Sequence, residues 1–78
     1  MKVKVIAYGI ARDIAAGTFE IDVDGHTVGD LRAALVRAYP ALKDLASLMI
    51  AVNASYAGDE VSLDPSDEVV LIPPVSGG

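Results

Sequence analysis

The chain has 78 residues, no cysteine and one histidine, with a formal net charge of −5 and 53% hydrophobic residues. This length allows one small domain, and the missing cysteines exclude disulfides and leave almost no ligands for a zinc site. The acidic balance argues against nucleic acid and anionic membranes as partners. No apolar run approaches the roughly 18 residues of a membrane span, and we see no signal-peptide pattern, so we expect a cytoplasmic protein with no membrane association.

Two segments near the amino terminus, residues 2–8 and 18–23, alternate between apolar and polar side chains and predict an antiparallel pair of strands. Between them, Ile10 and Ile14 are four residues apart, which predicts a single helical turn that Gly17 closes. The alternation places these apolar residues on the inner face: Val3, Val5, Ala7, Phe19, Ile21 and Val23.

The middle of the chain predicts the main helix. Thr27-Val28-Gly29-Asp30 is typical of a capping box that opens a helix. Pro40 is expected to end the helix, because its ring cannot continue it. Residues 41–48 fit either a short second helix or a packed loop. The apolar stripe at helical spacing comprises Val28, Leu31, Ala34, Leu35 and Ala38.

The last third of the chain predicts strands at 49–53, 61–63 and 68–72, separated by turns around Gly58-Asp59 and Asp64-Pro65. Strands on both sides of one main helix predict an α+β fold, the ubiquitin-like β-grasp, with a mixed sheet crossed by that helix. In this arrangement the first and last strands lie side by side and parallel. We predict a β-grasp domain over residues 1–72 and an extended, flexible tail over residues 73–78.

The tail reads Pro-Pro-Val-Ser-Gly-Gly. The prolines favour an extended exit from the domain, and two glycines without Cβ atoms can enter a narrow channel. We expect Gly78 to carry the free terminal carboxylate. Adenylation by ATP would make that carboxylate a good acyl donor, and a sulfur nucleophile would then leave a thiocarboxylate. Because the chain has no cysteine, a carried sulfur could reside only at this acyl position.

A terminal Gly-Gly pair alone favours a simple frayed end. Its combination with the strand order, the Pro-Pro pair and the short spacer favours carboxylate chemistry instead.

The stretch from residue 50 through residue 78, together with the short helical segment 11–15, resembles the MoaD family, the small sulfur-carrying subunits of molybdopterin synthase. The resemblance covers essentially the whole chain and is weakest at residues 41–48. The resemblance implies that a ubiquitin-activating-like adenylyltransferase, which uses ATP, activates Gly78, with Gly77 as its slender neighbour. It implies that the resulting thiocarboxylate donates sulfur to a pterin precursor on the large synthase subunit to form the molybdopterin dithiolene. It also implies a heterotetramer with that subunit, no bound cofactor, and no enzymatic activity of this chain alone.

The resemblance further implies an apolar patch that binds both partners. The matching positions here are Tyr8, Tyr56 and Ile72, with Arg12 beside them, although the family often has an aromatic residue at the position of Ile72. The tail residues Pro73, Pro74, Val75 and Ser76 would contact the partners as well. His26 has no companion ligands, so we predict no metal site.

Three other functions stay open. The chain could carry sulfur for another pathway, such as thiamin synthesis, with the same chemistry at Gly78. It could be a protein modifier that is joined through Gly78 to lysines of its targets. It could also be a non-catalytic β-grasp interaction module whose tail is inert.

Overall fold

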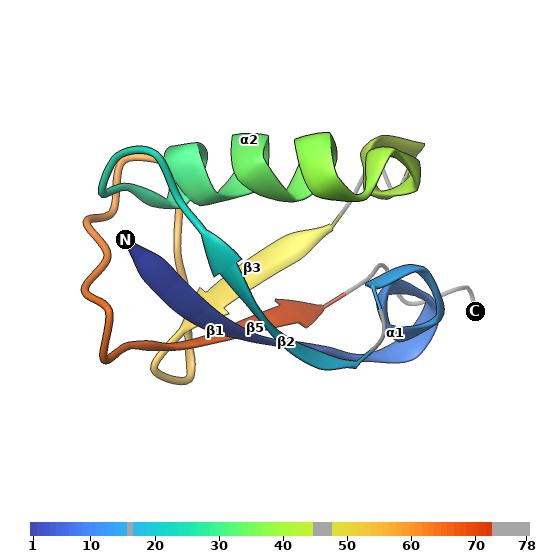
Figure 1. The fold of residues 1–78 in the computed structure, drawn as a ribbon. Coiled ribbons are helices and arrows are strands. Elements are labelled where there is room, and N and C mark those ends of the chain that lie inside the picture. The colour runs from blue at the N-terminus through green and yellow to red at the C-terminus, as the bar shows by residue number, and fades with distance from the viewer. Residues whose placement is uncertain (16, 45–47, 73–78) are drawn as a thin grey trace.

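The computed structural model describes residues 1–15, 17–44 and 48–72, with only the backbone described for Ile10 and Asp44. A five-stranded mixed sheet is covered on one face by a long helix (Figure 1). The strand order is β2-β1-β5-β3-β4, which confirms the predicted β-grasp arrangement. The elements are β1 (Lys2–Ala7), α1 (Gly9–Ala15), β2 (Thr18–Asp22), α2 (Val28–Ala38), the 3-10 helix η1 (Pro40–Asp44), β3 (Met49–Val52), β4 (Ser55–Tyr56) and β5 (Glu68–Ile72).

The centre of the sheet is the parallel pair β1 and β5, as the sequence predicted. β1 also pairs with β2, and β5 with β3, both antiparallel. Alternate residues of the central strands face α2 and are fully buried, which removes their apolar surface from water and supplies the main stabilising contribution. The largest fully buried side chains are Val3, Val5, Val28, Leu31, Leu35, Leu42, Ile50, Val69 and Leu71.

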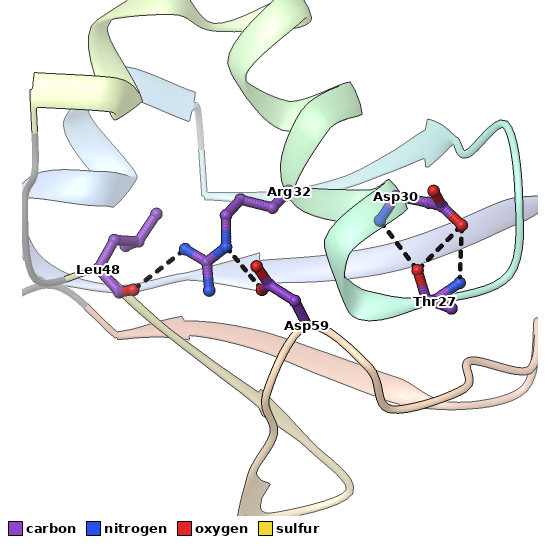
Figure 2. Close-up of polar contacts among 5 residues, drawn as sticks. All are labelled: Thr27, Asp30, Arg32, Leu48 and Asp59. Carbon is purple, nitrogen blue, oxygen red and sulfur yellow. Dashed lines mark hydrogen bonds and ion pairs between the residues drawn. The ribbon is translucent and has the colours of Figure 1, made fainter.

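The amino end of α2 is closed by the predicted capping box. The Thr27 hydroxyl accepts the backbone N–H of Asp30, and the Asp30 carboxylate accepts the backbone N–H of Thr27 (Figure 2). Gly29 in the first turn has a packing reason. A Cβ there would lie 3.2 Å from both the Cβ and the carbonyl oxygen of Asp59, so any larger residue would require the loop to move back by a few tenths of an ångström.

Two predictions about helices need correction. The segment after β1 is a seven-residue helix instead of a single turn, and Ala11 and Ala15 are its fully buried residues, while Ile14 is half-buried. Ala38 is exposed, because α2 ends there and the chain turns at Pro40. Leu42 of η1 fills the core next to the last turn in its place.

The predicted strand at 61–63 is wrong. The fourth strand is instead β4, which forms a hairpin with β3 through Asn53 and Ala54, both at positive φ. Residues 61–63 lie against the start of α2, where the N–H of Val28 donates to the carbonyl of Val61. Ser62 forms only an isolated bridge with Thr27. This segment therefore pairs with the loop before the helix and not with the sheet.

No helix in the described part of the chain is long and apolar enough to cross a membrane. Residues 45–47 and the predicted tail, residues 73–78, lie outside the described residues. The division into a domain and a tail stays a prediction.

Candidate functional site

The carboxyl ends of the two central strands, β1 and β5, lie side by side at one end of the sheet, next to α1 (Figure 1). The backbone N–H of Tyr8 donates to the carbonyl of Leu71 at 3.2 Å, which extends the parallel pairing one residue beyond β1. Ile72, the last residue of β5, lies opposite Met49 of β3. The chain therefore leaves the sheet at Ile72, between the exposed residues Tyr8 and Met49.

The sheet face that points away from α2, which we call the outer face, is divided into an apolar half and a charged half. Alternation along each strand assigns the residues, and the strand registers align them in rows across the sheet. The apolar half lies towards Ile72 and is called the apolar patch. It comprises Ile6, Tyr8, Met49, Ala51, Tyr56, Val70 and Ile72.

Two shallow hollows, each of about 310 Å³, indent the apolar patch. Ile6, Tyr8 and Arg12 line the first hollow, and Tyr56 and Ile72 line the second. Ile6 of the first hollow and Val70 of the second are neighbours in the register of β1 and β5. The two hollows are therefore neighbours on the sheet, with the Ile6–Val70 pair between them.

The structure brings the four predicted patch residues of the folded domain together on this face. Tyr56 is 66% exposed and Tyr8 is 55% exposed, so neither ring closes the core. Ile72 is half-buried between its neighbours on the sheet. Large exposed aromatic rings on an apolar face are typical of a binding surface. Their role as partner contacts remains a prediction.

Arg12 reaches the patch from α1. Its backbone N–H donates to the carbonyl of Tyr8 at 3.3 Å, which places the arginine one helical turn after the exposed tyrosine. Gly17 faces the arginine side chain, and even a Cβ at that position would meet it only at 3.9 Å. Within the described residues the single ion pair is Arg32–Asp59, so no described carboxylate lies within 4.0 Å of the Arg12 guanidinium. The positive charge of Arg12 is therefore available to pair with an acidic group of a bound protein.

Sequence reasoning did not select Met49, Ala51, Val70 or Ile6 for the patch. Met49 is 44% exposed, and Ala51 lies beside Tyr56 in the register of β3 and β4. Strand alternation gave the signal for Ile6, which shares a face with Tyr8. The same alternation in β3 sets Met49 and Ala51 on the face opposite Ile50 and Val52, and the position of β4, which the sequence did not predict, places Tyr56 beside Ala51. The tail residues Pro73, Pro74, Val75, Ser76, Gly77 and Gly78 lie outside the described residues.

The two carboxyl groups whose pKa is lowered, Asp30 and Asp64, are not part of the apolar patch. The hydroxyl of Thr27, followed by the backbone N–H groups of Thr27 and His26, lowers the pKa of Asp30. The N–H and hydroxyl of Ser66 lower the pKa of Asp64 in the turn before β5. Both shifts come from local hydrogen bonds that close a helix end or a turn, so they are structural.

The described side chains offer a surface for binding. None of the polar or charged ones is buried, and in residues 1–15, 17–44 and 48–72 no three acidic, histidine or cysteine side chains come together as a metal site would need. The outer face instead provides exposed aromatic rings, two hollows and, next to the point where the chain leaves the sheet, a guanidinium with no described carboxylate within 4.0 Å. Such a surface can dock the domain on a partner and direct whatever follows Ile72 towards it.

Comparison with known proteins gives a family match over residues 5–78, to the ThiS family. The molybdopterin synthase sulfur carrier subunit of Chlamydomonas reinhardtii is 37% identical, and the alignment covers 100% of both chains. Small archaeal modifier protein 1 of Haloferax volcanii is 39% identical over 88% of this chain and 91% of that protein.

Solved structures show the same fold. The crystal structure of SAMP1 from Haloferax volcanii matches with a TM-score of 0.84 and 31% identity, covering 100% of both chains. One chain of a complex of subunits 1 and 2 of molybdopterin-converting factor from Helicobacter pylori matches with a TM-score of 0.70 and 28% identity, again over 100% of both chains. These matches cover the β-grasp domain and the segment that follows it.

Proposed function

The chain belongs to the ThiS family and is a ubiquitin-like sulfur carrier of the MoaD type, and from this premise we propose that it is the small subunit of a molybdopterin synthase. The observation that carries the proposal is the full-length likeness to a molybdopterin synthase sulfur carrier subunit in a chain that follows its last strand with Pro-Pro-Val-Ser-Gly-Gly. The working group is the carboxylate of Gly78, with Gly77 keeping bulk away from the carbonyl that is attacked.

The chemistry proceeds in three steps. The Gly78 carboxylate attacks the α-phosphate of ATP on a ubiquitin-activating-like adenylyltransferase, and pyrophosphate leaves. A sulfur nucleophile at the oxidation level of sulfide then attacks the acyl carbon and displaces AMP, which leaves a thiocarboxylate. On the large synthase subunit this sulfur attacks a carbon of the pterin precursor and replaces an oxygen substituent, and water hydrolyses the resulting thioester, which returns the carboxylate and leaves the sulfur on the pterin. A second loaded carrier delivers the second sulfur of the dithiolene. ATP and the pterin are held by the partners, and the carrier contributes only its acyl group.

Two further features support this division of labour. The apolar patch adjoins the exit of the chain at Ile72, so docking through the patch aims the tail at the partner. The six residues from Pro73 to Gly78 span at most about 21 Å when fully extended, so the partner's reacting centre must lie within that reach. We propose a heterotetramer of two carriers and two large subunits in the cytoplasm. Tyr8, Arg12, Tyr56 and Ile72, with the tail residues Pro73, Pro74, Val75 and Ser76, provide the contacts.

The test uses intact and fragment masses. The protein is incubated with ATP, a sulfur donor and the adenylyltransferase of the same organism, and is then treated with a thiol alkylator. Because the chain has no cysteine, we expect one ATP-dependent adduct. Cleavage after Glu68 releases residues 69–78, which contain neither Met1 nor Met49, so methionine oxidation cannot imitate the exchange of oxygen for sulfur. Deletion of Gly78 should abolish the adduct while the domain stays folded.

An adduct outside residues 69–78, or none while a control carrier is loaded, would contradict the proposal. Intact mass also checks that Gly78 carries the free carboxylate.

A second candidate is a protein modifier, and the 39% identity to small archaeal modifier protein 1 specifically favours it. In that function the activated Gly78 carbonyl is attacked by a lysine amine of a target, and an isopeptide bond forms. The same cleavage after Glu68 would leave residues 69–78 as a branch on target lysines. Such branches without any alkylated thiocarboxylate would favour the modifier, whereas a thiocarboxylate without branches would favour the carrier.

A further inference from the structure

Three charged residues form a row across the outer face, directly beside the apolar patch. Lys4 of β1 lies opposite Glu20 of β2 in the antiparallel register and beside Glu68 of β5 in the parallel register. All three side chains are exposed and point away from α2. We call Glu20, Lys4 and Glu68 the charged row; its signs alternate, with one cation between two carboxylates.

The three side chains of the charged row form no ion pairs with one another. The one ion pair with nitrogen and oxygen within 4.0 Å among the described residues is Arg32–Asp59, which includes no residue of the row. Side chains opposite one another on neighbouring strands are close enough to influence each other, but these three remain separate. Their charged ends thus remain available to groups on a docked protein.

The backbone holds the row in place. Lys4 lies in β1, which pairs on both sides, with β2 and with β5. At the start of β5, the N–H of Glu68 donates to the side-chain oxygen of Asn53 at 3.0 Å, and its carbonyl accepts the N–H of Asn53 at 2.9 Å. The amide of Asn53 also donates to Asp67, so the turn beneath Glu68 is fixed. The three charges therefore project from a rigid frame.

The row also borders the surface that would be covered. The next residues on the outer face are Ile6 and Val70, and Glu68 itself lines the second hollow together with Tyr56 and Ile72. A protein seated on the apolar patch would place part of its rim over the charged row. Charges at an interface rim contribute mainly to the rate of association and to the orientation of docking.

We propose that the charged row sets the orientation in which the carrier docks, and that its partner presents a carboxylate flanked by two cationic side chains next to an apolar centre. This inference rests on the proposed function, since the partner is the large synthase subunit. Pairing Lys4 with the central carboxylate, and Glu20 and Glu68 with the flanking cations, fixes the position of the row on the partner, because a shift by one strand would bring like charges together. The row lies on one side of the apolar patch, so a carrier rotated on the patch would lose these pairs, and the row thereby directs the tail into the reacting centre.

The test compares Lys4→Glu with Lys43→Glu. Both replace one positive charge with one negative charge at an exposed lysine, but Lys43 lies on η1, in the helix layer. Binding of each variant to the large synthase subunit of the same organism is measured by calorimetry at low and at physiological salt. We expect Lys4→Glu to weaken binding about tenfold at low salt, and less at higher salt, because it faces the partner's carboxylate. Lys43→Glu should stay within about twofold of wild type.

A charge exchange within the row sharpens the result. The double variant Lys4→Glu with Glu68→Lys keeps the net charge and the attraction between β1 and β5, but it places like charges opposite one another on β1 and β2 and inverts two signs of the pattern. It should bind at least as weakly as Lys4→Glu. Equal binding by Lys4→Glu and Lys43→Glu would overturn the proposal. Tighter binding by Lys4→Glu would also overturn it, because that outcome requires a uniformly basic partner surface. Thermal unfolding confirms that each variant is folded.

The outcomes also separate the two levels of inference. If wild-type carrier fails to bind the large subunit, the proposed function fails and the orientation proposal falls with it. If wild type binds but the charge variants do not differ from their control, the proposed function stands and only the role of the charged row is wrong.

Discussion

The amino end of α2 and the apolar patch differ in whether their side chains are paired within the molecule or left exposed. At the helix end, polar groups are paired with one another. Thr27 and Asp30 close the helix, and Arg32 joins the Asp59 carboxylate at 3.0 Å and the Leu48 carbonyl at 3.3 Å (Figure 2). On the patch, large side chains stay exposed and Arg12 has no described carboxylate close by. The first region holds the molecule together, and the second is left free to bind.

This difference has a physical reason in a domain of 78 residues. Such a domain has a free energy of unfolding of only about 4–12 kcal/mol, so exposed apolar groups must be compensated by good packing and capping elsewhere. The layer between α2 and the sheet provides the packing, and the loop of Asp59 is tied to the helix by the N–H of Gly29 as well as by Arg32. Variants on the two regions should therefore separate folding from binding.

The largest effect on stability is expected from Leu31→Ala. Leu31 is fully buried between α2 and the sheet, so truncation loses its packing and leaves a cavity that the rigid sheet cannot close. We expect a loss of about 2–5 kcal/mol in the free energy of unfolding, measured by urea titration. Val36→Ala, at a half-buried position of the same helix, is the control. Similar losses for the two variants would contradict the assignment of the core to this stripe.

A smaller effect, on binding instead of folding, is expected from Tyr56→Asp. The ring is 66% exposed, so its loss should change the free energy of unfolding by no more than about 0.5 kcal/mol. The introduced charge would be desolvated in the covered patch, and affinity for the large synthase subunit should fall at least about tenfold. Tyr56→Phe keeps the ring and should bind nearly as wild type. Unchanged affinity of Tyr56→Asp by calorimetry would remove Tyr56 from the interface.

The smallest effect is expected from Thr27→Ala, which removes the helix cap. The cost should be about 1 kcal/mol near neutral pH, and Thr27→Ser should restore most of it. The Thr27 hydroxyl is the main cause that holds the pKa of Asp30 below its ordinary value of 3.8. The stabilisation from this carboxylate is therefore fully present above about pH 4 and is lost as pH falls through the lowered pKa.

Thr27→Ala removes the main cause of the lowered Asp30 pKa, so its stability depends less on the ionisation of Asp30. The difference in the free energy of unfolding between wild type and Thr27→Ala should therefore shrink on acidification. Urea titrations between pH 5 and pH 2.5 measure this difference. A difference that stays constant over that range would show that the Thr27–Asp30 contact does not contribute.

The elements predicted best were those with local causes. The capping residues of α2, the end of the helix before Pro40, and the boundaries of β5 are all as expected. The parallel pairing of the first and last strands followed from the predicted β-grasp arrangement and is confirmed. Periodicity and turn chemistry act over a few neighbouring residues, so the sequence displays them directly.

The errors involve contacts between distant segments. The hairpin of β3 and β4 turns through Ala54 at φ 70°, where alanine gives no turn signal, and Asn53 is held there by bonds to Asp67 and Glu68. Residues 61–63 look like a strand but pair with the loop before α2. Gly29 looks unfavourable in a helix until the close approach of Asp59 is seen. In each case a tertiary neighbour outweighs the local preference.

The sequence by itself predicted the β-grasp arrangement and the capped helix, because these depend on local periodicity and on residue chemistry, and it contains the Gly-Gly segment on which the proposed carrier chemistry rests. Only the tertiary structure decided which side chains share the outer face. The position of β4, the hollows around Ile6 and Val70, and the charged row of Glu20, Lys4 and Glu68 all depend on strand register. Register joins residues far apart in the chain, and a shift of one residue would turn every side chain of a strand to the other face.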